Sequence, residues 1–282
     1  MNIRTDMALE AHELSRGEAK EIDGVILKEY KHGDITRTIV DIVNDNGAQA
    51  LNKLKGRYIT IDAPELKNST SDYESVCHML AEQLRDMIKG SRKTLVVGLG
   101  NRDITPDALG TGVVSKLLVT AHIKKLMPEV LGDNFSSVYA ITPGVMGMTG
   151  IETVEIVKSV AEKVKPDVII AIDALAGADI NRVSTSIQIA DTGIAPGSGV
   201  GNHRDGLNKD SLGVKVIAVG VPTVIAAELI AGGEIDEKFK SIMVTTKDID
   251  LVIKRMSKTV ANGINLALHK DISLRELDEL VG

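Results

Sequence analysis

Between residues 94 and 231 the sequence alternates short apolar runs with longer stretches of helical periodicity, and this alternation restricts the possible folds more than any other feature. Four apolar runs predict buried strands, over 94–100, 137–142, 167–176 and 214–220. The stretches between them predict helices, one of about twenty residues ending at Met127 and one over 152–165. Such alternation predicts an α/β fold, with a mostly parallel doubly wound sheet flanked by helices.

The segments outside this 94–231 core fit a single domain over 1–282. They are predicted as an N-terminal arm over 1–24 with a helical turn near Met7–Leu14, a strand meander over 25–61, an amphipathic helix over 71–89 and a C-terminal helix over 245–269.

Two parts of the core deviate from the simple alternation. Apolar and polar residues alternate over Arg182–Ala190, which predicts a half-exposed strand, with an antiparallel position at a sheet edge as one option. Pro222 and Thr223 predict the start of a helix reaching about Ala231, followed by a polar connector over 232–241.

The composition excludes several classes of protein. The net charge of −6 provides no basic surface for sequence-independent binding to nucleic acid. No apolar run reaches membrane-spanning length and no signal region opens the chain, so we expect a cytoplasmic protein. Cys77 is the single cysteine, which rules out an intrachain disulfide and predicts a buried, inert thiol on its helix.

The stretch Thr94–Gly112 predicts a first site residue. Its apolar strand leads through a glycine-rich turn into Thr105-Pro106-Asp107, where Thr105 is a good N-cap and Pro106 suits the first helical position. Asp107 would then lie in the first turn, facing the positive end of the helix dipole. This is the carboxyl edge of a buried strand, where open α/β sheets place their ligands.

A second acid, Asp173, is expected to lie close to Asp107. The run Pro166–Gly177 is apolar except for Asp173, and burying an unpaired carboxylate costs several kcal/mol. Asp173 therefore either ends its strand at a cleft or has a partner. Two neighbouring carboxylates cannot both ionise cheaply, so a pair with Asp107 could share one proton and activate water. The alternative for both acids is structural: a helix cap for Asp107 and an ion pair for Asp173.

Weaker candidates surround this pair. Asp103 and Asp191 could line a cleft, although turn chemistry for Asp103 and strand termination for Asp191 are the more common explanations. The glycine-rich turns at 143–150 and 193–201 could direct backbone N–H groups at a carbonyl oxygen. The remaining candidates in or beside these turns are Gly144, Gly147, Ser198, His203 and Arg204. No dinucleotide or phosphate-loop pattern, nucleophile elbow or histidine pair accompanies them, so we expect no metal and no cofactor.

Several long segments keep a consistent order and spacing: IRTDMALE, VGLGNRDITPDALG, PGVMGMTGIET, PDVIIAIDALA, STSIQIADTGIAPGSGVGN, GVKVIAVGVPTV and MVTTKDID. From Ile3 to about His269 they closely resemble the germination proteases of endospore-forming bacteria. The resemblance implies a spore-core endopeptidase that degrades small acid-soluble DNA-binding proteins, with catalytic aspartates at Asp107 and Asp173. It also implies a homotetramer, cleavage after glutamate and a fold like that of the hydrogenase-maturation endopeptidases.

The sequence departs from the family pattern at three places. Ala195 stands where relatives carry a histidine, which argues for a metal-free acid pair. The 232–241 connector is short where relatives carry an insertion. Only two residues precede the motif at Ile3, so we expect either a form that is already mature or activation by at most a very short cut, with Glu10 or Glu13 as a possible site. Two alternatives remain open: a metal-sensing maturation-type peptidase and a non-catalytic α/β module that binds an anion.

Overall fold

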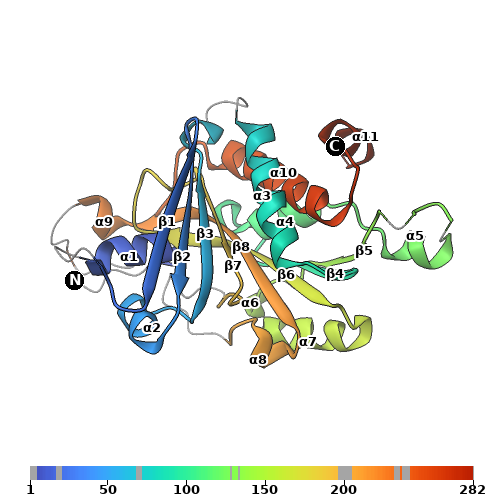
Figure 1. Cartoon of the computed structure of the whole chain (residues 1–282), viewed down its shortest axis with the longest axis horizontal. Helices are drawn as coiled ribbons and strands as arrows, with labels where there is room; N and C mark the ends of the chain where they lie inside the picture. Colours follow the sequence, from blue (N-terminus) through green and yellow to red (C-terminus); the bar gives the residue numbers. More distant parts are fainter. Residues whose placement is uncertain are drawn as a thin grey trace.

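The computed structural model describes residues 5–16, 21–67, 72–127, 129–132, 134–195, 205–231, 236 and 242–281. Within these residues nine strands form one mixed sheet, ordered β1-β2-β3-β7-β8-β6-β4-β5 with β9 beside β8. The predicted α/β class is confirmed (Figure 1). The strands are β1 Val25–His32, β2 Ile35–Ile42, β3 Gly56–Asp62, β4 Lys93–Gly98, β5 Ser137–Ile141, β6 Val168–Gly177, β7 Ser186–Ala190, β8 Lys215–Ala226 and β9 Met243–Val244.

One half of the sheet is parallel and is covered on both faces. Strands β8, β6, β4 and β5 run parallel to one another and form one end of the sheet. Successive β6 residues point to opposite faces, so Ile170 and Ile172 enter one core cluster, and Ile169 and Ala171 enter another. The first face is covered by α3 Tyr73–Met87, α4 Leu109–Val114 and α10 Ile249–Leu268, and the second by α7 Thr153–Val164 and α8 Lys209–Leu212. Both flanking layers can be followed in Figure 1.

The other half of the sheet is antiparallel, from β1 through β2, β3 and β7 to β8. The strand predicted over Arg182–Ala190 is present as the antiparallel β7, but the predicted half exposure and edge position are wrong, because β7 lies inside the sheet and is buried at every position. Its polar residues have protein partners in place of water. Ser186 donates to Asp62, and both ends of the Gln188 amide bond to the N-terminal arm.

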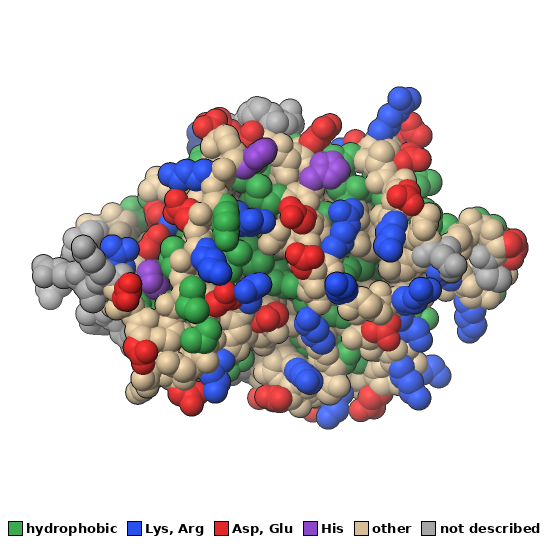
Figure 2. Space-filling view, viewed as in Figure 1, with side chains coloured by type: hydrophobic (Ala, Val, Ile, Leu, Met, Phe, Trp, Pro, Cys, Tyr) green, Lys and Arg blue, Asp and Glu red, His purple; other side chains and the backbone are tan. Residues whose placement is uncertain are grey.

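That N-terminal arm is more ordered than the sequence predicted. Helix α1 spans Ala8–Arg16 and joins the cluster beneath β2 and β3. Its first residue, Ala8, and the preceding Met7 are completely buried. A second short helix, α2 Asp45–Leu51, connects β2 to β3. Across the face shown in Figure 2, acidic and basic side chains are interspersed.

The prediction of a single helix reaching Met127 is wrong. A 3₁₀ turn η2 Thr105–Asp107, α4 Leu109–Val114 and α5 Ala121–Leu126 occupy that stretch. A Cβ at Gly110 would collide with backbone atoms of Leu99 and Ile172, so this glycine serves close packing on the sheet. The chain then leaves the helix so that the Thr120 hydroxyl can donate to Ser136 O at 2.5 Å.

The helix predicted to start at Pro222 is also wrong. Strand β8 continues through Pro222 to Ala226, and only then does α9 Ala227–Ala231 begin. A register shift between β6 and β8 accompanies the proline, which has no N–H to give to a ladder. Of the connector over 232–241, only Asp236 lies among the described residues.

The C-terminal region adds two corrections. Helix α10 starts at Ile249, later than predicted, because Thr245 instead donates its hydroxyl to Thr223 O at 2.7 Å. A further helix, α11 Leu274–Val281, was not predicted. The other short elements are η1 Pro64–Lys67 and α6 Met146–Thr149. Among the described helices, none combines the length and the apolar character needed to cross a membrane.

Candidate active site

A cavity of about 480 Å³ opens where β4 ends, and both predicted acids line it. Strand β4 stops at Gly98, which pairs with Ile172, so Asp173 is the first β6 residue beyond that end. Because β4 does not continue past Gly98, there is space beside β6 from Asp173 onward. The cavity is completed by Asp6, Leu99, Gly100, Asn101, Ile104, Pro106, Gly144, Val145, Thr153, Ala174, Leu175, Ala176, Thr223, Val224, Met243 and Thr245.

Asp107 is held by a tight turn and not by a long helix. Its Oδ2 accepts the Asn101 N–H at 2.7 Å. Gly100 makes this closure possible, because it adopts φ +90° and a Cβ there would collide with the Asp107 carbonyl oxygen. The prediction that Thr105 caps the helix is wrong, since Ile104 precedes η2 without a side-chain cap. A single 3₁₀ turn supplies no helix dipole to stabilise the Asp107 carboxylate, so the Asn101 N–H stabilises it instead.

Asp173 lies inside its strand, where the sequence predicted a strand end or a partner. It is the sixth residue of β6, is only 5% exposed and faces Gly220 of β8 in the ladder. Its Oδ1 accepts the N–H of Ala174 at 3.0 Å. Asp173 is therefore anchored by a backbone ladder, while its carboxyl group borders the cavity.

Asp6 is a third acid of this cavity, and the sequence reasoning missed it. Its N–H donates to Ala176 O at 2.9 Å, and its Oδ2 accepts the Ala176 N–H at 2.8 Å. The arm thus bonds to β6 past the end of β4, almost as a neighbouring strand would. The sequence signal was available, since Asp6 belongs to the segment IRTDMALE.

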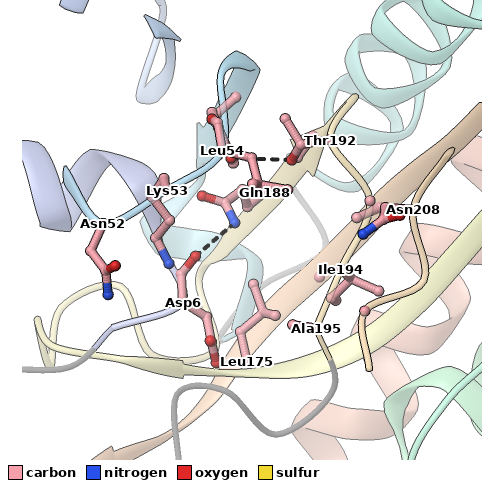
Figure 3. Close-up of a pocket in the computed structure, with 16 residues that line it drawn as sticks. Asp6, Asn52, Lys53, Leu54, Leu175, Gln188, Thr192, Ile194, Ala195 and Asn208 are labelled. Carbon is pink, nitrogen blue, oxygen red and sulfur yellow. Dashed lines mark hydrogen bonds between the residues drawn. The ribbon is translucent and has the colours of Figure 1, made fainter. Parts of the chain in front are cut away.

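A smaller pocket of about 220 Å³ adjoins the acid cavity and shares Asp6 and Leu175 with it. Figure 3 shows Lys53 and Gln188 directed toward Asp6. Gln188 donates to Asp6 O at 3.1 Å, and Lys53 Nζ donates to Thr5 O at 2.8 Å. Burial lowers the pKa of the Lys53 ammonium, although Asp6 and Glu10 oppose that shift. These contacts fix the arm against the cavity.

The other predicted residues lie elsewhere. Asp103 is exposed and donates its N–H to Asn101 Oδ1 at 2.9 Å, as turn chemistry predicts. Asp191 is exposed, accepts the Arg57 N–H at 2.8 Å and borders a different surface pocket. Gly144 lines the acid cavity, while Gly147 is exposed on α6. Ser198, His203 and Arg204 lie outside the described residues.

The predicted buried thiol is confirmed, because Cys77 is fully buried and burial raises the pKa of its thiol to about 12. In the part of the chain that the structure describes, no three histidine, cysteine or acidic side chains gather as a metal site would require.

The fold and the site define a class: an α/β protein whose acid-lined cavity opens at the carboxyl end of a parallel strand. Comparison with known proteins then identifies the family. Residues 3–242 match the germination protease family, and the chain belongs to that family. It is therefore an endopeptidase.

Curated relatives align over nearly the whole chain. The germination protease of Clostridium perfringens strain 13 is 43% identical over 322 positions, covering 99% of each protein. That of Bacillus subtilis strain 168 is 38% identical over 348 positions, covering 96% of this chain and 94% of the relative. Among solved structures, a [NiFe] hydrogenase maturation protease from Thermococcus kodakarensis is 19% identical with TM-score 0.37, covering 64% of this chain and 98% of that one.

Proposed function

We propose that this endopeptidase hydrolyses peptide bonds with Asp107 and Asp173 acting as a pair. The observation that carries the proposal is that both carboxylates line one cavity, although they lie 66 positions apart in the sequence. Asp107 arrives from a turn after β4 and Asp173 from β6 itself. Parallel neighbours bring the two acids to the same edge of the sheet.

The chemistry follows from two carboxyl groups in one cavity. Repulsion between like charges favours a state with a single negative charge, in which the pair holds one proton. The ionised member takes a proton from water as the water oxygen attacks the substrate carbonyl carbon. The protonated member donates its proton to the carbonyl oxygen. When the tetrahedral intermediate collapses, the member that took the water proton gives it to the leaving nitrogen, and the other member takes back the hydroxyl proton. Backbone N–H groups in the glycine-rich wall at Gly144 supply further donors for the developing oxyanion.

The proposed substrates are the small acid-soluble DNA-binding proteins of dormant spores, cleaved when germination begins in the spore core. The support is the family itself, whose members are named germination proteases. A homotetramer and cleavage after glutamate belong to the same proposal. The chain acts on the DNA-binding protein and has no need of direct contact with DNA.

Asp107→Asn and Asp173→Asn test the acid pair, because an amide keeps the shape of the side chain and cannot exchange the proton. We expect each variant to lose roughly 1,000-fold in kcat on a small acid-soluble spore protein, with an unchanged unfolding midpoint. Asp103→Asn is the matched control, since Asp103 lies exposed in the same turn outside the cavity. Near-parental turnover by either folded variant would remove that acid from the mechanism.

The same assay separates the metal alternative. A chelator is expected to leave the parental rate unchanged, as are reagents directed at serine or cysteine nucleophiles. Loss of activity on chelation, restored by one equivalent of metal, would favour the maturation-type peptidase.

A further inference from the structure

An irregularity in the β6–β8 ladder lies at the edge of the acid cavity. The two strands pair in regular register from Val168 and Lys215 up to Leu175 and Pro222. The next pair joins Ala176 to Val224, so Thr223 is an extra residue in β8. A bulge of this kind locally bends a strand and redirects a side chain, and bulges are frequent beside active sites.

The redirected side chain reaches the turn that carries Asp107. Thr223 is 1% exposed, lines the cavity and donates its hydroxyl to Pro106 O at 2.8 Å. Pro106 is the residue directly before Asp107 in η2. The bulge therefore ties the strand beside Asp173 to the turn that holds Asp107.

Two other bonds of this turn are local. Asp107 N–H donates to Ile104 O at 2.8 Å, and Asp107 Oδ2 accepts the Asn101 N–H. Local bonds give the turn its shape but do not fix its distance from β6. The Thr223 hydroxyl makes a non-local contact, which links the turn to the strand beside β6. Thr245 supports that contact by donating to Thr223 O at 2.7 Å.

We propose that Thr223 is a positioning residue, which sets the place of Asp107 relative to Asp173 through the Pro106 carbonyl. This inference rests on the proposed acid pair. Threonine fits both demands of the position: its β-branched side chain suits a strand, and its hydroxyl supplies the donor. Displacing a reacting group by about 1 Å can lower a rate by about 100-fold, so one hydrogen bond to this turn has a large effect on turnover.

Replacing the hydroxyl by a methyl group tests the proposal. We expect Thr223→Val to lower kcat by roughly 10- to 100-fold while KM changes less than about threefold, because the acid pair is displaced and the substrate contacts remain. Thr223→Ser keeps the donor and should stay within about threefold of the parent in kcat. Thr259→Val is the matched control, because this buried hydroxyl also donates to a carbonyl, Arg255 O at 3.0 Å, away from the cavity.

The pH dependence of kcat gives a readout that a purely structural role would not change. Two coupled acids titrate in two steps, whose separation grows with the repulsion between them. Asp6, the third acid of the cavity, accepts the Ala176 N–H away from the Thr223 contact and is common to parent and variant. If the turn moves away from β6 in Thr223→Val, the two apparent pKa values come closer together. Thr223→Ser and Thr259→Val should keep the parental separation.

The outcomes are decisive for each claim. Three results would each overturn the positioning role. They are a parental kcat in Thr223→Val, equal losses of kcat in Thr223→Val and Thr223→Ser, and a Thr223→Val protein that unfolds instead of turning over more slowly. Activity in Asp107→Asn would overturn the acid pair itself. An inactive Asp107→Asn beside a fully active Thr223→Val would leave the acid pair standing and remove only the role of Thr223.

Discussion

The two acids of the proposed catalytic pair, Asp107 and Asp173, are supported in different ways. Asp173 belongs to β6, which is paired by backbone ladders with β8 and, up to Ile172, with β4. Asp107 belongs to a turn that the Thr223 hydroxyl bonds at Pro106 O. Farther along the chain, Asn265 and His269 of the α10 region bond to Lys116 and Leu118, which follow α4.

The comparison shows where single substitutions can act. A strand in the middle of a sheet shares its support among many backbone hydrogen bonds, so no one side chain decides its position. A turn supported by a few buried side chains loses a large part of that support with each one removed. We therefore expect the Asp107 side to be the sensitive side of the site.

The largest loss of stability and activity is expected for Gly100→Ala, in the turn that holds Asp107. An alanine would hold φ +90° and place its Cβ against the Asp107 carbonyl oxygen, which cannot move without opening the turn. Strain and overpacking together should lower the free energy of unfolding by about 4 kcal/mol and abolish turnover. Urea unfolding and the protease assay measure the two effects. A stable, active Gly100→Ala protein would show that the turn is far more adaptable than this comparison holds.

The next effect is a pH dependence centred on His269. The ring is 1% exposed, and its Nε2 lies 3.1 Å from Leu118 O, so the neutral form with a proton on Nε2 donates to that carbonyl. Burial lowers the pKa of His269 to about 4. The unfolded chain, with an ordinary histidine pKa, binds the proton first as pH falls, so this contribution is complete above about pH 6.5 and is lost towards pH 4.

Between pH 7 and pH 4 this histidine should remove about 3 kcal/mol from the free energy of unfolding. His269→Gln keeps an amide donor for Leu118 O and cannot be protonated, so it should show a flatter dependence over the same interval. Urea unfolding midpoints at several pH values compare the two proteins. Parallel curves for parent and variant would contradict the prediction.

A smaller effect is expected for Asn265→Ala. The Asn265 amide accepts the Leu118 N–H at 2.9 Å and donates to Lys116 O at 3.1 Å, both in the chain after α4. Removing the amide leaves two backbone groups without these partners. This should lower the free energy of unfolding by about 2 kcal/mol and should lower kcat as well. Asn262→Ala is the control: Asn262 is a buried α10 residue that bonds to Tyr73 OH instead. Equal kcat values for the two variants would contradict the special role of this contact.

The smallest effect is expected on the Asp173 side. Gly220 faces Asp173 in the ladder, and a Cβ there would approach the Leu175 side chain at 2.5 to 2.8 Å. That side chain borders both cavities and can turn into free space. Gly220→Ala should therefore cost about 1 kcal/mol and leave kcat within about threefold. A loss as large as that of Gly100→Ala would remove the distinction between the two sides.

The sequence predicted the elements that local patterns encode. The unbroken apolar run of β6 and the shorter run of β4 predicted two buried parallel strands, since such strands need apolar residues on both faces. The same runs predicted Asp107 and Asp173 near the ends of two strands, whereas in the structure Asp173 is the sixth of the ten residues of β6. The sequence did not predict the broken helix after Asp107, because the roles of Gly110 and Thr120 depend on contacts with other strands.

The tertiary structure alone decided how the site is held. Thr223 and Pro106 are 117 positions apart, and Asp6 and Ala176 are 170 apart, so no local periodicity records either contact. The sequence suggested a helix start at Pro222-Thr223, whereas the structure has a bulge there, whose Thr223 hydroxyl bonds to Pro106 O beside Asp107. Burial patterns are local and can be read along the chain. A hydrogen bond between distant segments exists only after the sheet has brought them together.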